Sequence, residues 1–175
     1  MKPRPSGSAG TIERMEPTPV TEEARTLLRE AMSQHTAGRI DAALSTARRA
    51  VTLAPSFAEA HAYLGNTLVT RQRQFADGLT ALRHAVDLAP EDATILYTTG
   101  WCEEYVANAL ERPRQRHQAV SEEAGTLYSL ARAHFLRALD LNTDPLLKGD
   151  IEDMLDVVAA ATGEPWETDV VGRAG

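Results

Sequence analysis

The chain has 175 residues and a formal net charge of −7 at pH 7, which argues against a nucleic-acid partner, because such binders gain most of their affinity from basic surfaces. No apolar run reaches the ~18 residues of a membrane span, and residues 1–20 lack the apolar core of a secretory signal. A single cysteine, Cys102, excludes an intramolecular disulfide, so we expect a cytoplasmic protein of one domain.

Seven helices are predicted between two terminal tails. Residues 1–20 are rich in Pro, Gly and Ser and are expected to form a disordered tail, and residues 162–175 form a C-terminal tail. Between them, apolar residues recur with helical spacing over 22–36, 40–53, 57–70, 75–88, 92–111, 115–141 and 145–161.

Several helix ends carry characteristic residues. Pro55 and Pro90 predict two helix ends just before them, because a residue without an N–H group stops helix propagation. Ser56 and Glu59 have the spacing of a capping box that opens the third helix. Asp144, which precedes a proline, is predicted to cap the last helix.

A short segment recurs along the chain. Residues 50–55 read AVTLAP and residues 85–90 read AVDLAP, so their prolines are 35 positions apart. A second landmark agrees, because the small residues Ala31, Gly65 and Gly100 are separated by 34 and 35 positions. Two landmarks at one period predict stacked helical hairpins, in which the small residues let paired helices approach closely.

This pattern resembles the tetratricopeptide repeat (TPR), a 34-residue helix–turn–helix unit. The positions that match its signature are Ala43, Ala50 and Pro55 in the first copy and Leu64, Gly65, Ala85 and Pro90 in the second. A third copy ends in a degenerate segment at 138–143. The resemblance implies an all-α fold, a right-handed superhelical solenoid of antiparallel helix pairs over residues 21–161. Its repeats span about 22–55, 56–90 and 91–143.

Three departures from the repeat are visible. One residue is inserted within 71–75, and Gly78 stands where the repeat usually has alanine. The third copy carries a surplus between Tyr105 and Tyr128, which we expect to lengthen both of its helices. Their basic turn at 111–117 would then protrude as a hairpin tip.

The last helix, 145–161, is predicted to cap the solenoid. Its apolar stripe consists of Leu147, Ile151, Met154, Leu155 and Val158, and its opposite face of Asp150, Glu152, Asp153 and Asp156. A terminal cap needs one apolar face toward its neighbour and one polar face toward water.

The resemblance also implies that the first helix of each repeat lines a concave groove that binds a peptide or helix of another protein. The candidate groove residues are Arg25, Arg29, Met32, Tyr63, Asn66, Tyr97, Trp101 and Tyr105. Their register neighbours are Leu28, His35, Ala62, Val69, Thr94, Thr98 and Glu104. Aromatic side chains are enriched in binding hot spots. The alternative is that Tyr63, Tyr97 and Trp101 only pack helices together.

A candidate second contact lies in the basic turn. Arg112, Arg114 and Arg116 could meet an acidic surface of a partner, and the alternative is a solvated turn.

No residue set predicts catalysis, a cofactor or a metal. The five histidines form no H-E-x-x-H motif, and the acidic residues at 150–156 lack the glycine and spacing of an EF-hand. Nothing marks a base or oxyanion donors beside Cys102. We therefore predict that the chain is not an enzyme.

The function predicted from sequence is a protein-interaction module or scaffold, such as a subunit or assembly factor of a larger complex. Nearly all cationic residues are arginine and alanine is abundant, which indicates a GC-rich bacterial genome. The alternatives are a translocator chaperone like those of type III secretion, and an accessory module that acts through the basic tip. A chaperone-binding carboxylate clamp is not favoured, because only Asn66 has a counterpart and the groove has no lysine.

Overall fold

The regular elements of residues 19–166, the part of the chain that the computed structural model describes, are all helical. They are α1 (Glu22–Thr36), α2 (Ile40–Leu53), α3 (Ala58–Thr67), the π-turn η1 (Leu68–Gln72), α4 (Phe75–Leu88), α5 (Ala93–Glu111), α6 (Ala124–Leu141) and α7 (Pro145–Thr162). The predicted all-α solenoid is confirmed. Disorder was predicted for residues 1–20, of which 1–18 lie outside the described part.

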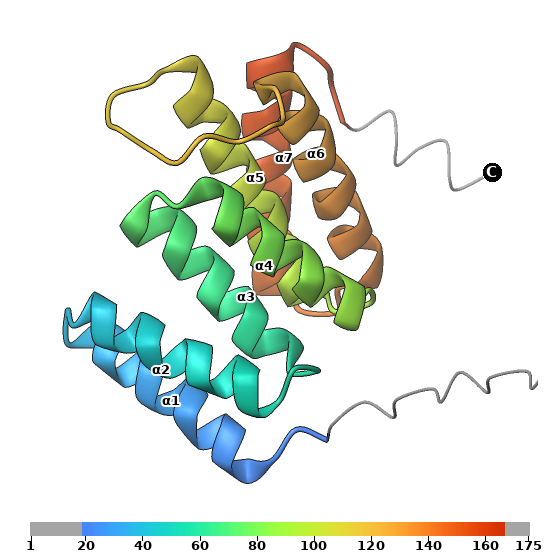
Figure 1. Cartoon of the computed structure of the whole chain (residues 1–175). Helices are drawn as coiled ribbons and strands as arrows, with labels where there is room; N and C mark the ends of the chain where they lie inside the picture. Colours follow the sequence, from blue (N-terminus) through green and yellow to red (C-terminus); the bar gives the residue numbers. More distant parts are fainter. Residues whose placement is uncertain (1–18, 167–175) are drawn as a thin grey trace, which may run out of the picture.

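Consecutive helices pack as hairpins that stack along the molecule (Figure 1). The pairs are α1 with α2, α3 with α4, and α5 with α6, and α7 covers the last pair. Alanines of the first pair, such as Ala31 and Ala47, are fully buried where these helices meet. Small side chains at such crossings let the helix axes approach.

The α3–α4 pair makes backbone contact at two glycines. A Cβ atom on Gly65 would lie 2.7 Å from the carbonyl oxygen of Gly78, and one on Gly78 would lie 2.6 Å from Val69 Cγ2. Both distances are too short for a side-chain carbon. The glycine at position 78, unusual for the repeat, is therefore required by this close approach.

The residue inserted after the second repeat's first helix is absorbed by the π-turn η1. Its i→i+5 bonding accommodates one more residue than an α-helical turn, and it ends at Arg73, which has a left-handed φ of 52°. The backbone N–H of Gln74 then donates to the carbonyl of Leu68 at 3.0 Å. The predicted helix 57–70 is thus α3 continued by η1.

The prediction of a helix over 115–141 is wrong in its first part. Residues 112–123, called the strap below, form an irregular segment without helix, and α6 begins only at Ala124. Pro113 lacks an N–H group and disfavours helical geometry in the residue before it. The strap also folds back over the turn between α3 and α4 instead of protruding (Figure 1).

Hydrogen bonds to the second repeat hold the strap. The backbone N–H of Gln118 donates to the Arg73 carbonyl at 3.0 Å, and Arg73 Nε donates to the Arg116 carbonyl at 3.2 Å. The side-chain oxygen of Gln118 accepts from the backbone N–H of Asp77 at 3.1 Å. It thereby caps α4, whose own N-cap residue, Gln74, makes no side-chain cap.

Side chains of the strap also pack on α4. The ring of His117 stacks on Phe75 with centroids 4.8 Å apart, and Glu122 forms an ion pair with Arg83. Val120, predicted as part of a helical stripe, packs against the core cluster that contains Phe75 from this non-helical segment.

The predicted cap is confirmed in α7. Asp144 accepts from the backbone N–H of Leu146 at 2.9 Å, and Ile151, Leu155 and Val158 are fully or almost fully buried. By contrast, the N-cap of α3 is Phe57 where Ser56 was predicted. The Phe57 side chain is buried against the first hairpin, and the backbone at that residue is not helical, so α3 begins only at Ala58.

The start of the C-terminal tail folds back onto α6 and α7. Trp166 Nε1 donates to Asp156 at 2.6 Å, and the guanidinium of Arg132 donates to the carbonyls of Glu164 at 3.0 Å and Pro165 at 2.6 Å. Residues 163–166 are therefore tied to the body of the fold.

Replacing Gly65 by alanine should lower the free energy of unfolding by about 1 to 3 kcal/mol, because the new methyl group forces α3 and α4 apart. Gly149 is a matched control, since it lies inside α7 with open space around its Cα. Gly149→Ala should stabilise by roughly 0.5–1 kcal/mol. Chemical denaturation followed by circular dichroism measures both, and equal effects of the two substitutions would contradict the close approach.

Candidate functional site

Two adjoining pockets run across the first helices of the three repeats. The larger has a volume of about 500 Å³ and is lined by His35, Asn66, Thr70, Arg71, Tyr97, Thr98 and Trp101. The smaller, about 280 Å³, is lined by Leu28, Met32, Glu59, Ala62, Tyr63, Asn66, Asp92, Thr94, Ile95 and Thr98. Asn66 and Thr98 belong to both, so the pockets form one depression between α1, α3 and α5, called the groove below.

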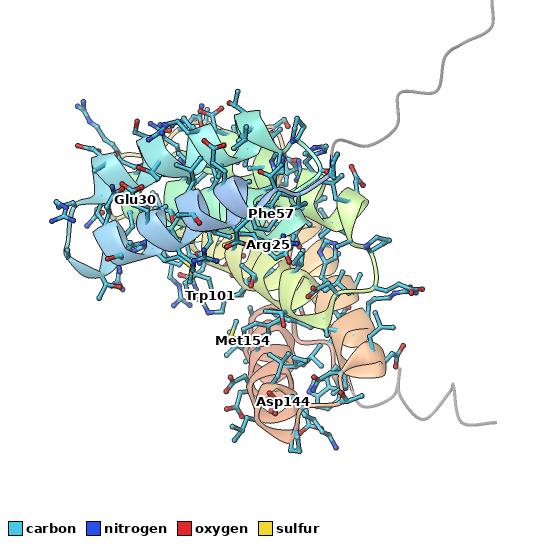
Figure 2. All side chains as sticks on the ribbon, turned by 90° about the horizontal axis from the view of Figure 1, so that it is seen from below. Arg25, Glu30, Phe57, Trp101, Asp144 and Met154 are labelled. Carbon is cyan, nitrogen blue, oxygen red and sulfur yellow. The ribbon has the colours of Figure 1, made fainter. Side chains whose placement is uncertain are left out.

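The structure brings five of the eight candidate groove residues together: Met32, Tyr63, Asn66, Tyr97 and Trp101 line the groove. Trp101 of α5 and Met154 of α7, both labelled in Figure 2, pack against the same core cluster. Met32 is 51% exposed, so its side chain is available for contact with a ligand in the groove.

Arg25 and Arg29 do not line these pockets. Arg25 donates to the carbonyl of Val20, and Arg29 pairs with Glu22 at 2.7 Å on the exposed surface of α1. The prediction that Val69 lines the groove is wrong, because its side chain is fully buried against Gly78. The extra residue of η1 changes the helical register there, so Val69 turns into the core.

A chain of hydrogen bonds crosses the groove wall from η1 to α1. Arg71 Nε donates to His35 Nε2 at 3.0 Å, and the Tyr63 hydroxyl donates to the carbonyl of Ala31 at 3.0 Å. His35 Nδ1 lies 3.2 Å from the Tyr63 oxygen and carries the proton in this arrangement, because its other nitrogen accepts. The hydroxyl of Tyr63 is thus fully used, and its ring faces the groove. Burial raises the pKa of Tyr63.

Arg71 is a groove residue that the sequence analysis missed. It lies in η1, where the inserted residue breaks the repeat register used to assign groove positions. The insertion itself, visible at 71–75, was the available signal.

Asn66 lines both pockets of the groove, and its side chain is oriented by a hydrogen bond from the core. The thiol of Cys102 donates to Asn66 Oδ1 at a sulfur–oxygen distance of 3.6 Å. The amide N–H groups of Asn66 make no hydrogen bond within residues 19–166 and remain available to an acceptor in the groove. A peptide carbonyl is such an acceptor.

The aromatic residues of α5 are half-buried, with one side against the core. The rings of Trp101 and Tyr105 stack with centroids 5.5 Å apart and 15° between planes, and Tyr97 packs against Phe135 at 5.9 Å. Burial, followed by the charges of Asp150 and Asp153, raises the pKa of Tyr97. These rings therefore support helix packing and also line the groove.

Tyr105 opens onto a third pocket of about 400 Å³, called the strap pocket below. It is lined by Arg73, Glu104, Tyr105, Asn108, Ala109, Arg112 and Arg114. Of the three arginines predicted as a second contact, only two line this pocket. Arg112 and Arg114 line this pocket, whereas Arg116 is exposed beyond it and is fixed through its carbonyl.

Other candidate chemistry is sparse in the described residues. No group of three or more His, Cys, Asp or Glu side chains there is placed to hold a metal ion. His134 and the buried Glu103 form a close pair at 2.7 Å between α5 and α6. A search of the helices within 19–166 for one with the length and apolar character of a membrane span finds none.

No protein-family model and no curated protein match the chain. Solved structures do. The first TPR of Spaghetti, bound to the HSP90 peptide SRMEEVD, has a TM-score of 0.58 at 13% identity and covers 79% of this chain and 94% of its own.

Two further structures extend the comparison. The Yersinia enterocolitica type III secretion chaperone SycD, in complex with a peptide of the translocator YopD, has a TM-score of 0.60 at 12% identity, over 81% of this chain and 95% of its own. A thermophilic TPR protein of Thermus thermophilus has a TM-score of 0.63 at 20% identity, over 81% of this chain and 66% of its own. The chain therefore has the TPR fold that its sequence predicted.

The thiol of Cys102 should resist alkylation in the native protein. Burial, and then the charge of Glu103, raises its pKa, so little reactive thiolate forms and reagents have no access. Iodoacetamide at pH 8 should label it only as fast as the fold opens, and rapidly in denaturant. Since the chain has one cysteine, mass spectrometry reports a single site. Equal labelling rates with and without denaturant would contradict the buried position.

Proposed function

We propose that this chain is a non-enzymatic interaction module that holds a peptide or helix of another protein in the groove. The observation that carries the proposal is the continuity of the two pockets at Asn66 and Thr98 across three successive repeats. A continuous depression suits a linear ligand, whereas separate cavities would suit separate small molecules.

The chemistry of the groove supports a peptide. Trp101 and Tyr97 offer apolar ring surface, and the amide of Asn66 offers donors to a main-chain carbonyl. The rings are already ordered by packing, so a ligand loses little side-chain entropy on contact. Two proteins of similar fold, Spaghetti and SycD, hold peptides of an HSP90 and of YopD, respectively.

We place this module in the cytoplasm of a bacterium as a subunit or assembly factor of a larger complex, with no cofactor. The reduced, buried thiol of Cys102 fits a reducing compartment. The arginine-rich, lysine-poor composition supports the bacterial source.

A second candidate is a type III secretion-like translocator chaperone. Its support is the likeness to SycD, which extends over 95% of that protein. Purification at native levels separates the two, because a chaperone copurifies with an unfolded secreted client and a subunit elutes in an assembly of fixed stoichiometry.

Replacing Trp101 by alanine should weaken peptide binding by about 2 kcal/mol, roughly thirtyfold, because the ring supplies apolar area in the groove. The probe is a displayed library of random peptides selected on the wild-type protein, and calorimetry with the enriched peptides gives the dissociation constants. Circular dichroism of Trp101→Ala establishes that the folded fraction is retained.

Val157→Ala is the matched control, since Val157 is an apolar side chain 44% exposed on α7 outside the groove lining. It should bind the enriched peptides like the wild type. Selection that enriches no peptide, or enriched peptides that bind Trp101→Ala with unchanged affinity, would overturn the groove as the binding site.

A further inference from the structure

The strap pocket continues the groove along α5. Trp101 lines the groove, Tyr105 lines the strap pocket, and the two rings stack on each other. Asn108 follows on the same side of α5, and Arg112 comes directly after the end of the helix, so the aromatic stripe of α5 leads to a cationic end. A ligand that follows α5 meets both pockets.

The two cationic side chains at this end are unpaired. Arg112 and Arg114 are exposed, and within residues 19–166 neither forms an ion pair with a carboxylate. Other arginines near the strap are already engaged. Arg83 pairs with Glu122, and Arg73 donates to the Tyr105 hydroxyl at 3.2 Å.

The strap is held at the residues that follow these two arginines. Arg73 holds the strap through the backbone of Arg116 and Gln118, and its guanidinium lies 5.0 Å from the centre of the Phe75 ring. Arg112 and Arg114 therefore lie between the end of α5, where the Arg112 N–H donates to the Asn108 carbonyl, and the point at which Arg73 holds the strap. Like charges this close repel each other and do not stabilise the isolated chain, so an anion from outside is the partner that they lack.

We propose that the strap pocket is a second subsite, in which Arg112 and Arg114 receive the carboxylate of an Asp or Glu residue of the same peptide that fills the groove. The proposal rests on the peptide-binding function proposed above. Arginine suits this role because its planar fork matches the two oxygens of a carboxylate. Asn108 adds a neutral donor at the pocket wall.

Glu104 sets where the carboxylate lies. It lines the same pocket and is half-buried, so its charge repels an anion from the groove side and directs it toward the strap. Removing that charge should tighten binding of an acidic peptide, whereas removing the arginines should weaken it. A general effect of net charge would give the same two signs, so the comparison with a charge-matched pair of arginines outside the pocket, Arg48 and Arg49 of α2, distinguishes a local subsite from it.

The length of α5 fixes the spacing in the ligand. Trp101 and Arg112 are eleven positions apart, which corresponds to about 16 Å along a helix. An extended peptide covers that length in about five residues, and a helical one in about eleven. The acidic residue should therefore occur at one of these distances from the apolar anchor.

The experiment selects displayed random peptides of about sixteen residues, long enough for either spacing, on four proteins. They are the wild type, Arg112→Gln/Arg114→Gln, Arg112→Glu/Arg114→Glu, and the control Arg48→Gln/Arg49→Gln, which removes the same charge from exposed positions on α2. The wild type and the control should enrich an apolar anchor with Asp or Glu at a fixed distance. The glutamine variant should keep the anchor and lose the acid, and the glutamate variant should enrich Lys or Arg there.

Affinities complete the test. The glutamine variant should bind the best acidic peptide about fivefold more weakly at low salt, with the loss reduced at high salt, because exposed pairs are screened. Glu104→Gln should bind the same peptide more tightly.

Three outcomes would overturn the proposal. An enriched anchor without acids removes the subsite and leaves the groove intact, whereas no enrichment at all removes the proposed function with it. A single-stranded oligonucleotide that binds the wild type, competes with the acidic peptide and is lost in the glutamine variant would assign the pocket to phosphates instead.

Discussion

Backbone contact between paired helices is the constraint on which this arrangement depends. At the α3–α4 crossing a side chain does not fit on Gly65, because a Cβ there would lie only 2.7 Å from the carbonyl oxygen of Gly78. Fully buried alanines such as Ala31 and Ala47 serve the first pair in the same way. Because the two helices of each hairpin are in such close contact, the first helix fixes the direction in which the second one runs. The first helices of successive repeats therefore fall on one side and form the groove walls.

Arg73 joins the repeats where the regular pattern is broken. Its left-handed backbone ends the π-turn, and its carbonyl and side chain hold the strap. The same guanidinium reaches the Tyr105 hydroxyl and lies over Phe75. A strained conformation at a residue with a side chain persists only where its surroundings fix it. Here the fixing contacts come from three segments, so the insertion and the strap stabilise each other.

Local patterns predicted the helices and the groove register, because apolar spacing and the 34–35-residue period are properties of neighbouring residues. The strap was not predictable in this way. Gln118 caps a helix 41 positions earlier at Asp77, and no local signal marks such a partner. The helical spacing through Val120 was misleading, since the non-helical strap also brings that side chain to the core. Arg71 was not predicted as a groove residue, because the π-turn shifts the register on which groove positions were assigned.

Packing and binding are not alternatives for the aromatic residues of α5. Trp101 is held from one side by Tyr105 and the core, and its other side opens into the groove. A ring ordered in this way contributes contact area without a large entropy loss. The stack of Trp101 on Tyr105 also connects the groove to the strap, because the Tyr105 hydroxyl accepts a hydrogen bond from Arg73, which holds the strap. Loosening the strap should therefore weaken contacts in the groove that the strap never touches, through the freedom it returns to the rings.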